Sequence, residues 1–397
     1  MRPCSTLLII TCTASLMLLA CEDSSTGAGA APAADGWSVL VSDASQVDAT
    51  TDVPDEADSI RTPPQDTAQA LDVGRPPAPD TADEDALLDT VDLTDSGNGE
   101  ADAEEIITEP WFEPGELGEH PVTVQTVSVS GQGSSFQAKL YVPESDAPSR
   151  AVLFLPGFML SASDFAITSE RLATHGFIVL TPSFGDSFLN AIDHADLAAH
   201  SSAMLDWIVA ENEQLSGPIG GSLDASGFGI AGHSRGGKVA LMTALQDPRI
   251  KAVYTLDPVD SIGGPFDTTP TPENPSVTPE LIGDLAIPAG FLGAGKGGEG
   301  FQPCAPAAEN HEAYYDAANG AAVAYHHVDP SAGHMDYIDS GAAGLCTGGE
   351  SPKEAREAGA KTLVAFMRAH LLGQDAYQSY LAGEDVDPRF TWESKSP

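Results

Sequence analysis

The spacing of hydrophobic and polar positions changes once along the second two thirds of the chain. Residues 122–129 and 136–142 alternate with a period of two, and a Gly-Gln-Gly turn at 131–133 separates them. This pattern predicts an antiparallel hairpin. Beyond it the apolar positions form short continuous runs, which is typical of strands buried on both faces. These runs cover residues 151–155, 177–180, 227–231, 252–256, 287–292 and 321–328.

Segments with helical spacing lie between these runs. We expect helices at 163–174, with Gly176 as a C-terminal stop, and at 238–245 and 309–318; a longer one carries Leu197, Met204, Leu205 and Ile208 on one face. The sequence SPKE at 351–354 predicts a capping box that opens a final helix ending near Gly373. Alternating buried strands and helices predict the α/β class, with a mostly parallel central sheet and helices on both faces.

The N-terminal segment has the pattern of an export signal. Met1 and Arg2 precede an apolar run, Leu7 to Leu19, that is too short to span a bilayer. The run ends in the sequence LLAC, which resembles a bacterial lipoprotein cleavage box. We therefore expect residues 1–20 to be a lipoprotein signal peptide and Cys21 to be lipidated. The chain would then be exported and anchored to a membrane, in the periplasm or at the cell surface; cleavage by an ordinary signal peptidase is the alternative.

Composition separates the next segment from the rest. Residues 21–110 are rich in Asp, Glu, Ala, Thr and Pro, with Arg61 and Arg75 as the only basic residues. Such a segment cannot bury enough apolar area to offset its ordering entropy, so we expect an acidic disordered tether. The catalytic domain should then span 111–397. The formal net charge of -42 argues against a nucleic-acid partner, since phosphates would be repelled.

The cysteine count agrees with export. Cys4 and Cys12 would leave with the signal peptide and Cys21 would carry lipid, so Cys304 and Cys346 remain for the folded domain. Two cysteines in an oxidising compartment suggest one disulfide, and two separate buried thiols are the alternative.

The sequence GHSRGG at residues 232–237 is the centre of the candidate site. It follows the apolar run 227–231 and precedes the helical segment 238–245. In this strand, turn and helix context, G-x-S-x-G is the pattern of a nucleophile elbow, whose glycines allow strand and helix to approach closely. Ser234 is therefore the candidate nucleophile.

The base should follow the last strand of the sheet, because chain order in this arrangement is serine, acid, histidine. After 321–328 comes DPSAGHMD, which makes His334 the candidate general base. The other histidines nearby are His311, which opens a helix, and His326 and His327, which lie within a strand. We interpret these three as structural.

The acid is less determined by the sequence. Asp257 ends the strand that follows the elbow helix, and a carboxylate at a strand's carboxyl end would face the same edge of the sheet as Ser234. The usual position is one strand later, where Glu299 lies. Asp257 is our prediction, with Asp260 and Glu299 as alternatives.

An oxyanion hole needs the backbone N–H after the nucleophile, that of Arg235, and one from the loop after the third strand. Phe158 is the expected second donor. We expect the Arg235 side chain itself to be exposed beside the elbow. Acyl transfer by this machinery needs no cofactor, and we expect no metal site.

Four separated motifs resemble the signatures of the chlorophyllases, over roughly residues 140 to 345. They are GHSRGGK at 232–238, DPVD at 257–260, PCAP at 303–306 with NHE at 310–312, and GHMD at 333–336. The resemblance implies an α/β-hydrolase fold and hydrolysis of a carboxylic ester with a bulky apolar alcohol. It also implies that the first aspartate of the DPV motif, Asp257, is the acid. The segments PGF at 156–158 and HGFIV at 175–179 are similar to the cutinase-like polyester hydrolases.

The sequence thus predicts a serine carboxylic-ester hydrolase with a Ser-His-Asp triad. A lipase or polyester hydrolase is the alternative among ester hydrolases, and an amidase would use the same machinery. The alternative of another class is an inert surface lipoprotein that binds a ligand with a hydrolase fold. Residues 261–285, rich in Pro, Gly and Thr, lie where a lid over the acyl pocket would be. The sequence does not indicate the natural substrate.

Overall fold

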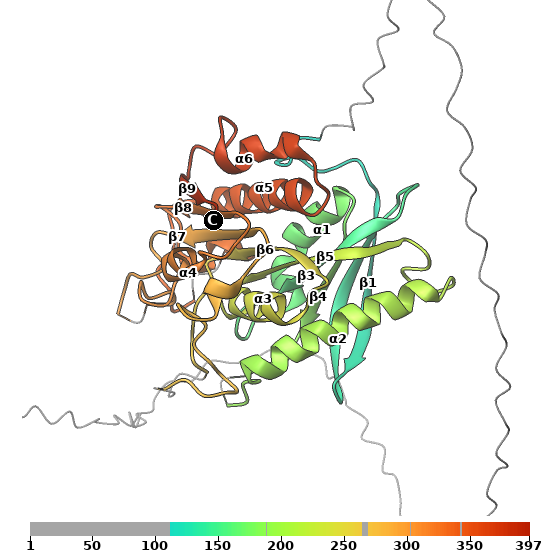
Figure 1. The fold of residues 1–397 in the computed structure, drawn as a ribbon, viewed down its shortest axis with the longest axis horizontal. Helices are drawn as coiled ribbons and strands as arrows, with labels where there is room; N and C mark the ends of the chain where they lie inside the picture. Colours follow the sequence, from blue (N-terminus) through green and yellow to red (C-terminus); the bar gives the residue numbers. More distant parts are fainter. Residues whose placement is uncertain (1–111, 188, 264–268, 302, 342–343) are drawn as a thin grey trace, which may run out of the picture. The chain divides into compact units, whose positions relative to one another are not determined.

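The computed structural model describes residues 112–397 apart from 188, 264–268, 302 and 342–343. The predicted signal peptide, Cys21 and the acidic tether lie outside these residues. Within them, a single sheet has the strand order β1-β2-β4-β3-β5-β6-β7-β8-β9 (Figure 1). The strands are β1 (Val122–Gly131), β2 (Ser134–Pro143), β3 (Ser149–Leu155), β4 (Ile178–Ser183), β5 (Leu223–His233), β6 (Ile250–Leu256), β7 (Ala289–Ala294), β8 (Ala324–Asp329) and β9 (Thr391–Lys395).

The central strands, from β4 through β3 to β8, are parallel, and the pairs β1–β2, β2–β4 and β8–β9 are antiparallel. The helices are α1 (Ala166–Thr174), α2 (His194–Glu213), α3 (Arg235–Gln246), α4 (His311–Ala317), α5 (Pro352–His370) and α6 (Ser379–Ala382), with short 3-10 helices η1 (Ala162–Phe165), η2 (Ile282–Asp284), η3 (His334–Tyr337) and η4 (Asp375–Gln378). The described chain therefore has the predicted α/β-hydrolase fold.

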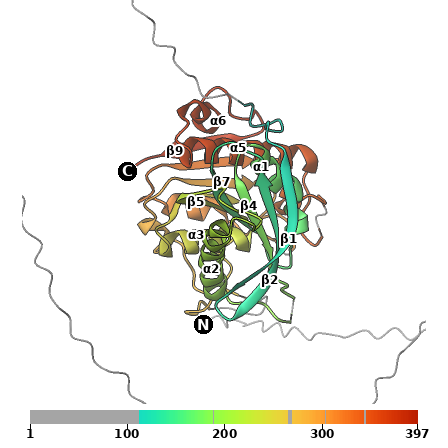
Figure 2. The same ribbon diagram turned by 90° about the vertical axis from the view of Figure 1, so that its right-hand side faces the viewer.

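The predicted hairpin is confirmed and forms one edge of the sheet. Val129 pairs with Phe136, and the turn places Gln132 and Gly133 at φ angles of 51° and 78°. Figure 2 turns this edge toward the viewer and shows the two long strands twisting together. Positive φ at both central residues is what a tight hairpin turn requires.

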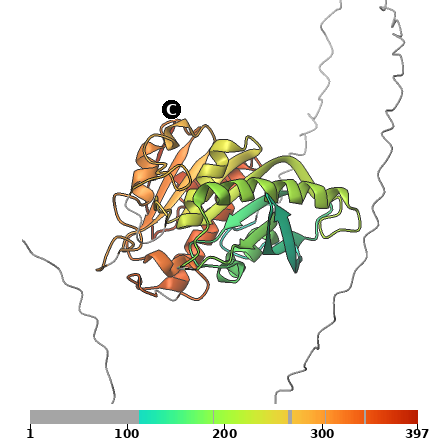
Figure 3. The same ribbon diagram turned by 90° about the horizontal axis from the view of Figure 1, so that it is seen from below.

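The two faces of the sheet bury separate hydrophobic clusters, because successive side chains of a strand point to opposite faces. On β3, Leu153 belongs to the cluster under α2, α3 and α4, and Phe154 to the cluster under α1 and α5. Figures 1 and 3 show α2 and α3 together on the first of these faces. The elbow helix α3 thus packs on only one of the two clusters.

The structure confirms that a helix begins at 351–354 but contradicts the predicted capping box. Ser351 is the N-cap of α5 and Pro352 its first residue, but the Ser351 side chain makes no capping hydrogen bond. Its backbone, at a ψ of 71°, departs from the extended conformation that directs a capping hydroxyl onto the helix. Strand β9, which the sequence reading missed, covers the outer edge of β8.

The segment 261–285 is partly packed into the domain. Val277, Ile282 and Leu285 are buried in the cluster under α3 and α4. Ile282 lies in η2, which contacts both of these helices. Among the described residues, no helix combines the length and apolar character needed to cross a bilayer.

Candidate active site

The turn between β5 and α3 holds Ser234 in a rarely used backbone conformation. Its φ and ψ are 55° and -126°, and its backbone N–H donates to the Leu256 carbonyl at 3.0 Å. A Cβ added at Gly232 would lie 2.3 Å from the Gly236 carbonyl oxygen, and one at Gly236 would lie 2.1 Å from that of Leu155. Only glycine fits at either position, so strand and helix meet closely enough to hold the serine out from the turn.

The structure brings Ser234, His334 and Asp257 into one hydrogen-bonded row. His334 Nε2 lies 2.9 Å from Ser234 Oγ, and His334 Nδ1 lies 2.6 Å from Asp257 Oδ2. Asp257 is fully buried, and its other oxygen, Oδ1, accepts a hydrogen bond from the Ala294 N–H at 3.1 Å. The carboxylate can accept only, so Nδ1 carries a proton and Nε2 is free to accept one from the serine.

Each member of this row comes from a different loop at the carboxyl edge of the parallel strands. Ser234 follows β5, Asp257 follows β6 and His334 opens η3 after β8. Asp257 has a φ of 44°, and its N–H donates to the Leu292 carbonyl of β7. That bond holds the turn after β6 against the neighbouring strand, beside His334.

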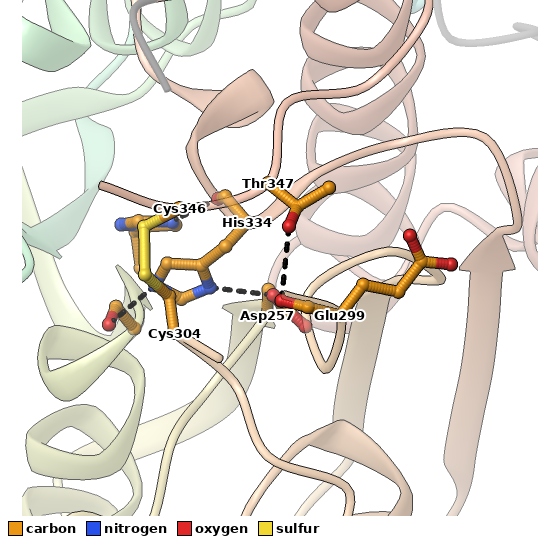
Figure 4. The surroundings of a disulfide bond; sticks show 8 residues. Asp257, Glu299, Cys304, His334, Cys346 and Thr347 are labelled. Carbon is orange, nitrogen blue, oxygen red and sulfur yellow. Dashed lines mark hydrogen bonds and ion pairs between the residues drawn. A yellow bond between two sulfur atoms is a disulfide. The ribbon is translucent and has the colours of Figure 1, made fainter. Parts of the chain in front are cut away.

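The two alternative acids lie elsewhere. Glu299 is exposed, and Figure 4 shows its carboxylate pointing away from His334. Asp260 is buried and forms an ion pair with Lys238 at 3.0 Å. Burial would raise the pKa of Asp260, but Lys238 and hydrogen bonds from Thr278 and Ser276 outweigh burial and lower it. Neither carboxylate contacts the candidate base.

The disulfide between Cys304 and Cys346 is present and lies beside the candidate base (Figure 4). It joins the loop after β7 to the loop that carries His334. The hydroxyl of Thr347 also donates to the Glu299 carbonyl at 3.0 Å. The His334 loop is therefore fastened to its neighbour by a covalent bond and a hydrogen bond.

His233 contacts the candidate base from the side of the elbow. Its ring lies against that of His334, with centroids 4.7 Å apart, and its Nε2–H donates to the His334 carbonyl at 2.9 Å. Burial, together with His334, lowers the pKa of His233 to about 3. His233 is thus neutral at physiological pH and contributes a fixed contact.

The Arg235 side chain is buried, which contradicts the expected exposed position. It is 4% exposed, forms an ion pair with the Asp186 carboxylate, whose side chain is 1% exposed, and lies over the Phe158 ring at 5.1 Å. A guanidinium removed from water needs such a partner. Arg235 thus joins three loops: the elbow, the loop after β3 with Phe158, and the loop after β4 with Asp186. Sequence reasoning missed Asp186 because it is one of many loop carboxylates.

The other predicted histidines lie away from Ser234. His327 Nε2 bonds to the Leu381 carbonyl at 2.8 Å. His311 and His326 contact each other at 2.8 Å, and His311 Nε2 lies 3.9 Å from Asp257 Oδ1, the oxygen that does not contact His334. Over the residues that the structure describes, no group of three or more His, Cys, Asp or Glu is placed to hold a metal ion.

Comparisons of the sequence with known proteins find a matching family and several relatives. The sequence model of the family described as Chlorophyllase matches residues 108–389. Chlorophyllase-2 of Arabidopsis thaliana is 29% identical over 253 residues, which cover 59% of this chain and 76% of that protein. Chlorophyllase-1, chloroplastic, of Citrus sinensis is 28% identical over 280 residues, 67% of this chain and 82% of that protein. Cutinase est1 of Thermobifida alba is 29% identical over 142 residues, 36% of this chain and 46% of that protein.

The buried Lys238–Asp260 pair gives a testable prediction on stability. Lys238 has no exposed surface, and it also donates to the carbonyls of Ser261 and Pro275. Lys238→Met would leave the Asp260 carboxylate buried without its cation. We expect the free energy of unfolding, measured by urea denaturation, to fall by about 3–5 kcal/mol.

Lys353→Met is the matched control, because Lys353 pairs with Glu357 at 3.7 Å on an exposed helix face. Its loss should cost less than about 1 kcal/mol. Equal losses in the two variants would contradict the importance of the buried pair.

Proposed function

Because the chain belongs to the chlorophyllase family, we propose that it is a serine carboxylic-ester hydrolase acting through a Ser234-His334-Asp257 triad. The observation that carries the proposal is the buried row of hydrogen bonds, 2.9 Å and 2.6 Å long, that ends at an elbow serine. Similarity to proteins named chlorophyllases and cutinases supports the same reaction class.

In the proposed mechanism, Ser234 Oγ attacks the ester carbonyl carbon while His334 Nε2 accepts the hydroxyl proton. The N–H groups of Phe158 and Arg235 stabilise the oxyanion of the tetrahedral intermediate. When the ester C–O bond breaks, His334 returns the proton to the leaving alcohol. Water then attacks the acyl-enzyme by the same steps and releases the acid and Ser234. Asp257 keeps the imidazole in the productive tautomer.

We propose that the substrate is an apolar ester with a bulky apolar alcohol, as the resemblance to the chlorophyllases implies. A lipase or a polyester hydrolase is the second candidate, supported by the similarity to the Thermobifida cutinase. Alkyl esters of one acid with increasingly large alcohols, long-chain glycerides and polyester films distinguish these substrates. Preference for the films or the glycerides would contradict the chlorophyllase-like specificity.

We also propose that the chain is exported and anchored through lipid on Cys21. The sequence pattern at 18–21 is the support. In cells given an alkyne-labelled fatty acid, we expect the full chain to be labelled and Cys21→Ser to lose the label and the membrane fraction. Cys12→Ser, inside the predicted signal peptide, should remain labelled. Equal labelling of all three would exclude Cys21 as the acceptor.

The ester-hydrolase proposal is tested with p-nitrophenyl esters of increasing acyl length. We expect turnover by the wild type and, for Ser234→Ala, loss of kcat by about 10⁵-fold or more, together with loss of labelling by a fluorophosphonate. The dependence on chain length measures the acyl pocket. A wild type that neither hydrolyses any ester nor reacts with the fluorophosphonate would instead support the inert binding lipoprotein.

The identity of the acid is tested by removing charge at one carboxylate at a time. Asp257→Asn should lower kcat by about 10⁴-fold, because an amide favours the wrong tautomer of His334. Glu299→Gln is the matched control and should leave kcat within about twofold, since that side chain is exposed and points away from His334. The reverse order of effects would make Glu299 the acid.

A further inference from the structure

A row of polar side chains extends from the edge strand β9 to Asp257. Glu393 Oε1 of β9 lies 3.2 Å from His326 Nδ1 of β8, and His326 Nε2 lies 2.8 Å from His311 Nδ1 of α4. His311 Nε2 then lies 3.9 Å from Asp257 Oδ1. The last distance is too long for a hydrogen bond, but it joins a dipole to a carboxylate inside a buried site, where electrostatic contacts are weakly screened.

The fold makes room for this row. A Cβ at Gly293 of β7 would lie 2.3 Å from the His311 ring. The ring therefore occupies the space that the side chain of any residue other than glycine at position 293 would need. The Tyr315 ring stacks on His326, with centroids 4.8 Å apart. His311 is 2% exposed and Asp257 is not exposed at all. The inner end of the row is therefore fixed in place.

Proton counting determines how the row is oriented. Three contacts link Asp257 to Glu393 through the two imidazoles, two of them at hydrogen-bond distance, and each is electrostatically favourable only when an N–H points along it. Two neutral imidazoles supply only two, so their N–H groups point together toward one carboxylate and leave a lone pair facing the other. A third proton on the row would satisfy both ends.

We infer that the two N–H groups point toward Asp257 rather than toward Glu393. Glu393 is 64% exposed on its side chain and can turn into water, whereas Asp257 is buried and held by Ala294 and His334. A lone pair facing a carboxylate costs more in the buried contact. His326 Nε2–H then donates to His311 Nδ1, and the N–H of His311 is on Nε2, facing Asp257.

We propose that His311 is a positioning residue that presents Nε2–H to Asp257 Oδ1 and so stabilises the carboxylate through the oxygen that does not contact His334. His326 fixes the tautomer of His311. The inference rests on the proposed triad and adds a function for two histidines that the sequence assigned to structure alone.

The remaining groups near the row do not replace this N–H. Burial lowers the pKa of His311, which keeps the ring neutral, although the Asp257 charge opposes the shift. The hydroxyl of Tyr337 in η3 donates to the Gly293 carbonyl at 3.0 Å and is engaged there. Besides His311 and His326, the titratable groups near the row include His327 of β8, Glu312 and Tyr315 of α4, and Lys395 of β9.

The test compares His311→Phe, which keeps a ring but removes the N–H, with His311→Gln, whose amide restores a donor near the Nε2 position. Without the donor, Asp257 attracts the His334 proton more strongly. We expect His311→Phe to lower kcat about tenfold and to move the acid limb of kcat/KM for p-nitrophenyl butyrate up by about half a pH unit or more. His311→Gln should recover most of both.

His327→Phe is the matched control, since it replaces another buried imidazole on β8 that does not contact Asp257. It should leave the acid limb unchanged. If His311 only fills space, we expect the opposite order: His311→Phe should lose less activity than His311→Gln, and the loss of activity in each variant should follow its loss of Tm. That order, or an unchanged acid limb in His311→Phe, would overturn the inference. An inactive wild type would instead refute the proposed function itself.

Discussion

The site depends on the direct contact between helix α3 and the backbone of the strands beneath it. At Gly232 and Gly236 the backbones meet with no side chain between them. This closeness forces the turn that holds Ser234 at positive φ, and it brings the first turn of α3 beside the loop after β3. The catalytic proposal therefore rests on backbone packing before it rests on any side chain.

Two buried ion pairs hold the loops around that turn. Arg235 and Lys238, both in the first turn of α3, pair with Asp186 after β4 and Asp260 after β6. Both pairs are almost fully buried, so each loop is tied to the elbow helix through a contact that is costly to break singly. The first turn of α3 thus holds the surrounding loops with two cations and directly follows Ser234, the proposed nucleophile.

The features that the sequence predicted well are those encoded locally or by chain order. The elbow, the hairpin and the alternation of strands and helices each occupy one continuous stretch, and the position of His334 follows from its place after β8. That Asp257 rather than Glu299 contacts His334 depends on how neighbouring strands are placed in the sheet, which no local sequence pattern encodes. Arg235 pairs with a residue 49 positions earlier in the chain, and Lys238 pairs with one 22 positions later. No local sequence pattern predicts either pairing. Strand β9 is short and mostly exposed, so it has no apolar alternation to read.

The disulfide has a consequence for covalent topology. Cys304 and Cys346 close a ring of chain that contains β8 and His334. If a protease cuts any one peptide bond inside that ring, both new ends remain attached to the same molecule. A single nick would therefore leave His334 covalently joined to the part of the chain that carries Ser234.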